Sequence, residues 1–167
     1  MLDQHVRIQV INLLTLGQAH MTFEEAVRDF PLDDINTCVD QVEYTFWHLL
    51  EHLRICQWDI LDYMRNPNYK ELTFPDDLWP VREAVIDETG WQKTIQQFLA
   101  DRAELVAIID DPQTDLYRPI SHGYDSHTIF REILIVADHN AYHIGEFCIL
   151  RHIKGHWYEA SKQRIDC

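Results

Sequence analysis

The apolar residues of this chain recur at helical spacing over long stretches that few glycines or prolines interrupt. Within residues 45–66, Phe46, Leu49, Leu50 and Leu53 lie three or four positions apart and so share one face of an α-helix. The 167 residues include only 5 Gly and 6 Pro, so helices of this length can continue without a break. An amphipathic helix must bury its apolar face, and other helices are the partners this chain offers.

Four segments carry this pattern, and we expect a helix over each: residues 3–18, 45–66, 83–109 and 127–153. Thr45 is a suitable N-cap for the second helix, and Ser126 or Asp125 for the last one. Thr22 begins a capping-box pattern before a short helical turn.

No segment shows the period-2 alternation of a β-strand. The pattern therefore predicts an all-α four-helix bundle, with residues 1–167 forming one domain. Residues 66–82, which contain three prolines, form a long connection between helices two and three. Such a connection inside a compact domain is typically functional or crosses the molecule.

Charge and hydropathy exclude several classes of partner. The chain has 14 Lys and Arg against 28 Asp and Glu, a net charge of −14 without a basic stripe, so we expect no nucleic acid or anionic membrane as a partner. Neither an 18-residue apolar run nor a signal-peptide pattern is present, which predicts a cytoplasmic protein. Its four cysteines form no C-x-x-C pair and are expected to be reduced.

His139 and His143 stand four residues apart in the sequence Asp-His-Asn-Ala-Tyr-His-Ile-Gly-Glu. Four residues make slightly more than one helical turn, so both imidazoles project from the same face of the predicted last helix. Two rings at this spacing can hold one divalent cation, which imidazole nitrogens bind at about 2.0–2.1 Å. The pair therefore indicates a metal site.

The third ligand should come from the second helix, which offers His48, His52 and Cys56 along one line. We favour His52, because it lies in the middle of the apolar stripe between Leu49 and Leu53. His48 lies one turn closer to the helix start, where we expect more solvent. Three histidines with an open position are typical of a catalytic site, in which a bound water or thiol becomes acidic.

Two common metal motifs are excluded. Asn140 follows His139, so the Glu of a zincin His-Glu-x-x-His motif is missing. No Glu in the chain has a His three residues later, as a di-iron bundle requires. The site should therefore hold one divalent transition metal, such as Zn, Ni, Fe or Mn.

Several segments resemble the DinB/YfiT-like superfamily of metalloenzymes. They are Thr45–Leu61, Trp79–Pro80, Trp91 with Phe98 and Asp101–Arg102, Asp115–Leu116, and above all His127–Glu146. The resemblance implies a four-helix bundle with one metal held by His52, His139 and His143. The family motif often has Gln where this chain has Glu146, and this carboxylate could orient a ligand or act as a base.

The family includes transferases that use low-molecular-weight thiols such as bacillithiol or mycothiol, and others described as metal-dependent hydrolases. The resemblance thus implies S-transfer or hydrolysis on a small-molecule substrate. Asp59, two turns beyond His52, joins Asp138 and Glu146 as a candidate catalytic or ligand-orienting group. The alternative is a non-catalytic helical module that binds a metal or ligand, and the many aromatic residues would suit a homodimer.

Overall fold

The computed structural model describes residues 2–156 and shows a helical bundle. Its elements are α1 (Leu2–Thr15), α2 (Phe23–Val27), the short 3-10 helix η1 (Leu32–Asp34), α3 (Phe46–Arg65), α4 (Glu88–Asp110) and α5 (Ile129–Ile153). The predicted all-α fold with four long helices is confirmed. The described residues contain no helix that is long and apolar enough to cross a membrane.

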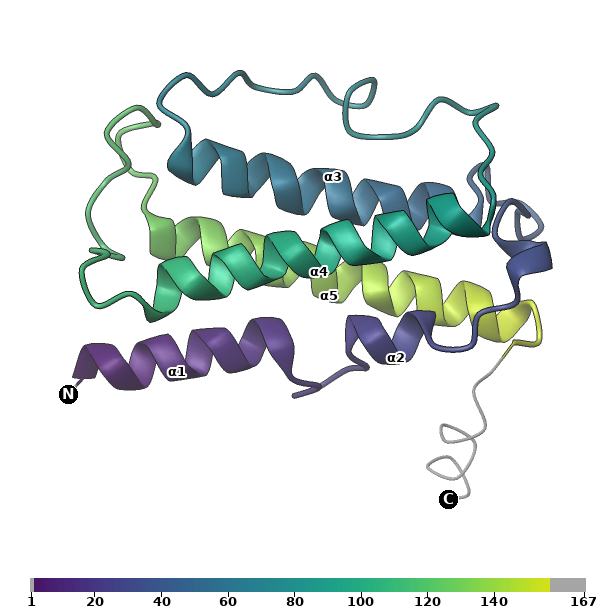
Figure 1. Cartoon of the computed structure of the whole chain (residues 1–167), viewed down its shortest axis with the longest axis horizontal. Coiled ribbons are helices and arrows are strands. Elements are labelled where there is room, and N and C mark those ends of the chain that lie inside the picture. The colour runs from purple at the N-terminus through teal and green to yellow at the C-terminus, as the bar shows by residue number, and fades with distance from the viewer. Residues whose placement is uncertain (1, 157–167) are drawn as a thin grey trace.

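The helix α3 packs against both α4 and α5, and α1 packs against the same two helices from the other side. Figure 1 shows α1 and the short α2 following one another along this side of the bundle. The connection over residues 66–87 runs past α3 from its end to the start of α4 (Figure 1). The helices α3 and α5, which carry the predicted metal ligands, are therefore neighbours.

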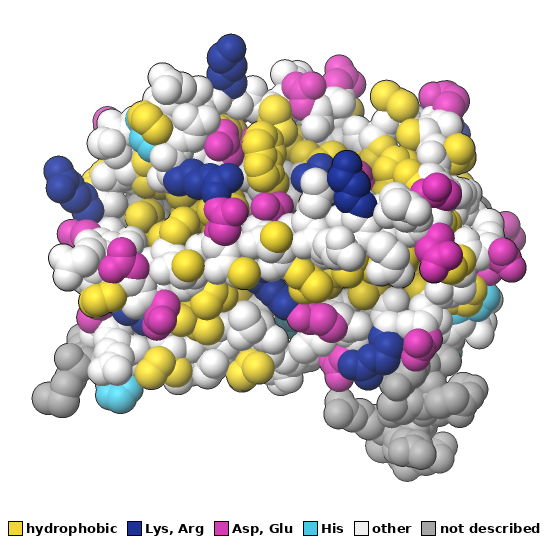
Figure 2. Space-filling view, viewed as in Figure 1, with side chains coloured by type: hydrophobic (Ala, Val, Ile, Leu, Met, Phe, Trp, Pro, Cys, Tyr) yellow, Lys and Arg dark blue, Asp and Glu magenta, His cyan; other side chains and the backbone are white. Residues whose placement is uncertain are grey.

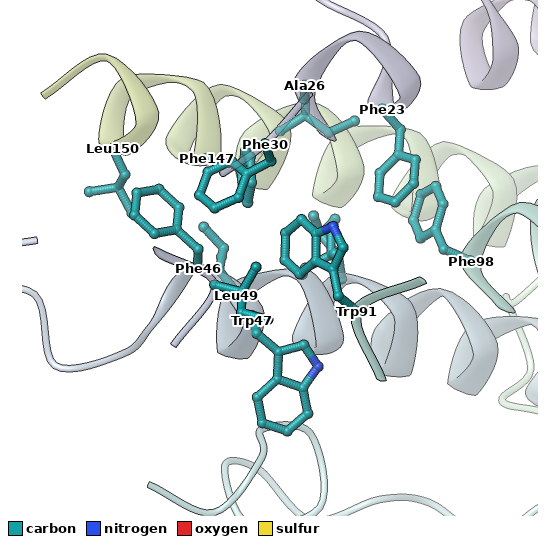
Figure 3. Close-up of a cluster of buried hydrophobic side chains, with 14 of the residues drawn as sticks. Phe23, Ala26, Phe30, Phe46, Trp47, Leu49, Trp91, Phe98, Phe147 and Leu150 are labelled. Carbon is teal, nitrogen blue, oxygen red and sulfur yellow. The ribbon is translucent and has the colours of Figure 1, made fainter. Parts of the chain in front are cut away.

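An aromatic cluster joins α2, α3, α4 and α5 at one end of the bundle (Figure 3). Phe23 of α2 stacks on Phe98 of α4 with ring centroids 3.8 Å apart, and Trp91 and Phe147 are 1% exposed. A second apolar cluster includes Leu61, Leu105, Ile109 and Ile133, each without exposed surface. Burial of such side chains contributes about 25 cal/mol per Å² of apolar surface, which holds the long helices together.

The starts of α2 and α3 confirm the predicted caps. The side chain of Thr22 accepts from the backbone N–H of Glu25, whose carboxylate accepts from Thr22 in return. The side chain of Thr45 likewise accepts from the backbone N–H of His48, and the Nδ1 of His48 accepts from the backbone N–H of Thr45. Each pair satisfies two backbone donors that a helix start leaves free.

The other predicted helix bounds were less accurate. The helix α4 begins at Glu88 rather than residue 83, because Asn36 donates to the carbonyl of Ile86 and accepts from its N–H, which holds that segment outside the helix. The cap of α5 is Thr128, not Ser126 or Asp125. The backbone N–H of His127 donates to the carbonyl of Tyr124, and that of Ile120 donates to the carbonyl of His127, so Asp125 and Ser126 lie in a turn before the helix.

The face of the molecule in Figure 2 carries acidic and basic side chains scattered among apolar ones. Lys and Arg do not gather into a stripe on this face (Figure 2). Cys38, Cys56 and Cys148 are free thiols, as the sequence predicted for these three, and Cys167 lies outside the described residues.

Candidate metal centre

Three histidines from two helices converge between α3 and α5. His52 lies on α3 and is 4% exposed, while His139 and His143 lie one turn apart on α5 and are partly buried. The ring centroids are 5.1 Å apart for His52 and His139, 4.8 Å for His52 and His143, and 4.5 Å for His139 and His143. The structure therefore places the three predicted rings beside one another, although the described group whose ligand atoms all lie within 4.8 Å of one another contains Cys56 in place of His143.

The spacing between a ring nitrogen of His52 and one of His139 fits a shared ion. The Nε2 atoms of His52 and His139 lie 3.3 Å apart. Two nitrogens bound to one tetrahedral ion at about 2.0–2.1 Å are separated by about 3.3 Å. Burial lowers the pKa of His139 to about 4, and the charges that His143 and His52 can carry add to this effect. His139 is therefore neutral near pH 7, as a metal ligand must be.

Two of these rings are oriented by hydrogen bonds on their far sides. The Nδ1 of His52 lies 2.7 Å from the carbonyl oxygen of Leu78, and the Nδ1 of His143 lies 2.7 Å from Oε2 of Glu146. Since a carbonyl and a carboxylate only accept, Nδ1 donates in both cases. The lone pair of each ring is then on Nε2, which is how proteins usually orient a metal-binding histidine.

Glu146 is the predicted catalytic candidate that the structure places at the cluster. Burial by itself would raise the pKa of Glu146, but hydrogen bonds from His143 and Tyr44 outweigh it and hold the pKa below its usual value. Burial and Glu146 together raise the pKa of the Tyr44 hydroxyl. Glu146 is thus an ionised carboxylate that positions His143, and Tyr44 positions Glu146.

The connection over residues 66–87 covers the site. Trp79 stacks on His52 with ring centroids 3.9 Å apart and planes 8° from parallel, and Tyr44 packs against Trp79 at 5.1 Å. Leu78, whose carbonyl receives the His52 Nδ1–H, belongs to the same segment. Trp79 was expected near the site only through the family resemblance. Tyr44 was not predicted, because no local pattern links it to Glu146, 102 residues away.

Cys56 lies closer to the cluster than expected. Among the described residues, His52, Cys56 and His139 form a group whose potential ligand atoms all lie within 4.8 Å of one another. The Cys56 Sγ is 3.5 Å from Nδ1 and 3.8 Å from Nε2 of His52. Burial, followed by the charge of Asp59, raises the pKa of this thiol to about 12. Without a metal the thiol is therefore protonated, but a metal would favour the thiolate.

His48 has a structural role. It is 3% exposed, so the expectation that it lies nearer solvent was wrong. Its Nδ1 accepts from the backbone N–H of Thr45, and its Nε2 lies 3.0 Å from the carbonyl oxygen of Ala84. Both ring nitrogens are engaged in attaching the start of α3 to the connection, which leaves no lone pair for a metal.

The other two predicted catalytic candidates lie elsewhere. Asp59 lines a separate cavity and accepts a hydrogen bond of 2.9 Å from the Tyr69 hydroxyl. Asp138 is exposed on α5. The chain thus presents a histidine cluster with one associated carboxylate, Glu146.

A protein-family model matches residues 15–147, a range that contains the three converging histidines, and its description is the DinB superfamily. Comparison with curated proteins and with solved structures found no match.

Proposed function

Because this chain belongs to the DinB superfamily, we propose that it binds one divalent transition metal and is an enzyme of thiol-dependent S-transfer or metal-dependent hydrolysis. The ligands would be the Nε2 atoms of His52, His139 and His143. The observation that carries the proposal is the convergence of these rings, with two Nδ1 atoms already hydrogen-bonded to oxygen acceptors on their far sides.

Three protein ligands leave a coordination position for a reactant, which favours a catalytic role. One edge of the site also faces solvent, since the side chains of His143 and Glu146 are 12% and 26% exposed. A metal held there would lower the pKa of a thiol or water and so supply a nucleophile near neutral pH. A low-molecular-weight thiol or another small molecule could approach along this exposed edge.

The residues around the histidines have distinct roles in this proposal. The Glu146 carboxylate fixes the ring of His143, and the Tyr44 hydroxyl holds Glu146 in place. Trp79 packs over one face of His52 and excludes water from it. These groups restrict the rings to one arrangement, which reduces the cost of binding an ion.

One observation favours the alternative of a non-catalytic metal-binding module. Cys56 belongs to the close group with His52 and His139. If Cys56 and His143 were both ligands, four protein groups would close the tetrahedral site, as in structural zinc sites. Whether Cys56 binds the metal therefore distinguishes the proposed enzyme from the non-catalytic module.

Metal content tests the ligand set. Untagged protein should hold about one divalent ion per chain, and the variant His52→Ala/His139→Ala/His143→Ala should hold none. The control His5→Ala, which removes an exposed histidine of α1, should retain the ion. Circular dichroism verifies that each variant is folded. Stoichiometric metal in the triple variant would refute the proposed ligands.

Cobalt substitution distinguishes the open site from the closed one. A cobalt–thiolate bond gives a sulfur-to-metal charge-transfer band, whereas imidazole ligands do not. We expect Co²⁺ protein without this band and with the same spectrum in Cys56→Ser. A charge-transfer band that disappears in Cys56→Ser would establish thiolate ligation and favour the non-catalytic module.

Activity is tested by screening low-molecular-weight thiols with electrophiles, and hydrolysable substrates alone, with and without a chelator. Turnover should depend on the metal and fall with His139→Ala. Turnover that persists after complete removal of the metal would contradict the proposed mechanism.

A further inference from the structure

A second cavity lies beside α3, about two helical turns (seven residues) beyond His52. Its volume is about 150 Å³, and residues of α3, the connection over residues 66–87, the segment before α5 and the first turn of α5 line it, with one side open to solvent. Three tyrosines and three carboxylates supply most of its wall: Tyr63, Tyr69, Tyr124, Asp59, Glu71 and Glu132. None of these groups contributes to the histidine cluster.

The aromatic rings of this cavity form a continuous row of contacts from Tyr69 through Tyr63 and His127 to Tyr124. Tyr63 and Tyr69 meet edge to face with centroids 5.1 Å apart, and His127 lies 5.8 Å from Tyr63 and 5.2 Å from Tyr124. The Tyr63 hydroxyl accepts from the backbone N–H of Tyr124 at 3.0 Å. Gly123 permits this close approach, because a Cβ at that position would collide with the Tyr63 hydroxyl. These contacts therefore hold the row of rings in place without a ligand.

The carboxylates of the cavity differ in how their charge is balanced. The Oε1 atom of Glu132 lies 2.7 Å from Nη1 of Arg131 and 3.2 Å from Nδ1 of His127. Asp59 and Glu71, in contrast, accept hydrogen bonds only from tyrosine hydroxyls among the described residues. The Tyr69 hydroxyl donates to Asp59 at 2.9 Å, and the Tyr124 hydroxyl donates to Glu71 at 3.3 Å. Hydroxyl donors leave the negative charge in place, so the cavity carries uncompensated negative charge beside aromatic rings.

The geometry favours a cation larger than a metal ion. Ca²⁺ and Mg²⁺ require several oxygen ligands that converge within about 2.0–2.6 Å of one point. Among residues 2–156, the one group of three or more His, Cys, Asp or Glu side chains whose ligand atoms all lie within 4.8 Å of one another is His52, Cys56 and His139, and no carboxylate of this cavity belongs to it. The carboxylates of the cavity thus surround a space and do not converge on a point.

We propose that this cavity binds the ammonium group of a small organic cation. The faces and edges of the tyrosine rings would surround its alkyl substituents, since an aromatic face attracts a cation. The carboxylates of Asp59 and Glu71 would compensate its charge. This site is distinct from the proposed metal centre and does not depend on it.

Calorimetric titration with choline and with butylammonium tests the proposal. We expect saturable binding of at least one of them. The uncharged isostere of choline, in which carbon replaces nitrogen, should bind at least about tenfold more weakly, because it has the same shape but lacks the charge. Equal binding of the isostere, or no saturable binding of either ammonium compound, would overturn the proposal. Displacement of choline by equimolar Ca²⁺ would also overturn it, because it would show a site for hard cations.

Variants identify the cavity as the site. Asp59→Asn/Glu71→Gln keeps the shape of both side chains and should weaken ammonium binding about tenfold or more. The matched control Asp33→Asn/Asp76→Asn removes the same charge from two exposed carboxylates outside the cavity, and its affinity should be close to that of the unmodified protein. Unchanged affinity in the first pair would reject this location.

Tyr124→Leu provides a second variant that should fold, since Tyr124 is 62% exposed. Leucine retains apolar bulk but has no aromatic face, so affinity for choline should fall while affinity for the isostere changes little. An equal loss for both probes would show that the tyrosine supplies only apolar contact, which would contradict recognition of the charge.

Discussion

At the residue scale, Asp59 combines partial burial with an uncompensated charge. Burial raises its pKa, the Tyr69 hydrogen bond opposes this effect, and the nearby carboxylates of Asp62 and Glu71 add to it. The charged form is therefore less favourable in the folded protein than in the unfolded chain. Such a group reduces stability at neutral pH, and a functional site can retain it for the sake of a ligand.

The variant Asp59→Asn should be more stable than the unmodified protein at pH 7. The folded pKa of Asp59 lies above its unfolded value of 3.8. Between these two pKa values the folded state binds more protons than the unfolded state, so the free energy of unfolding falls as the pH rises from the unfolded to the folded pKa. The advantage of Asn should therefore be present at pH 7 and shrink as the pH falls toward 3.8. Urea unfolding at several pH values measures it, with Asp76→Asn as the control. An advantage that does not change with pH would contradict this explanation.

At the element scale, two buried arginines attach helix ends to one another. Arg7 of α1 donates to the carbonyl oxygens of Ile109 at 2.6 Å, Asp111 at 2.9 Å and Thr114 at 2.6 Å, where α4 ends. Arg151 of α5 donates in the same way to the carbonyl of Ala26 at the end of α2. Helix ends leave carbonyls without partners, and the guanidinium groups supply donors for them.

Replacing Arg7 by Met should lower the free energy of unfolding by about 2–3 kcal/mol, because buried carbonyl oxygens would lose a charged donor. Arg7→Lys should recover part of this loss, since an ammonium group is compact and cannot form the same planar set of bonds. The matched control Arg82→Met changes an exposed arginine and should have little effect. Urea denaturation measures the difference, and equal curves for Arg7→Met and Arg82→Met would contradict the role of Arg7.

At the scale of the whole molecule, the proposed ion joins α3 to α5, two helices whose ligands lie 87 residues apart in sequence. A ligand that binds only the folded state stabilises it by an amount that grows with the free concentration of the ligand. Metal binding should therefore stabilise the bundle as a unit.

Thermal unfolding at increasing free Zn²⁺ or Ni²⁺ should show a rising midpoint. The stabilisation should reach about 2.7 kcal/mol when the free metal is about 100 times its dissociation constant. The variant His52→Ala/His139→Ala/His143→Ala should show no such rise, and His5→Ala should behave like the unmodified protein. A similar rise in the triple variant would place the stabilising metal elsewhere.

Much of the bundle was predictable because helical periodicity is local. The spacing of Leu49, Leu50 and Leu53 defined α3 within a residue of its bounds, and the Thr22 and Thr45 caps are set within one turn. The starts of α4 and α5 were not predicted correctly. Hydrogen bonds of the segments before these helices, those of Asn36 with Ile86 and of Ile120 with His127, determine where the helices begin.

The side chains of the two sites were likewise predictable only in part from the sequence. The sequence alone determined that His139 and His143 share one helix face, because four residues are close to one helical turn. Only the tertiary structure decided that Trp79 stacks on His52, that Tyr44 reaches Glu146, and that the tyrosines around Asp59 line a cavity. These contacts depend on the path of the long connection and on how α3 lies against α5, and no local repeat in the sequence records either.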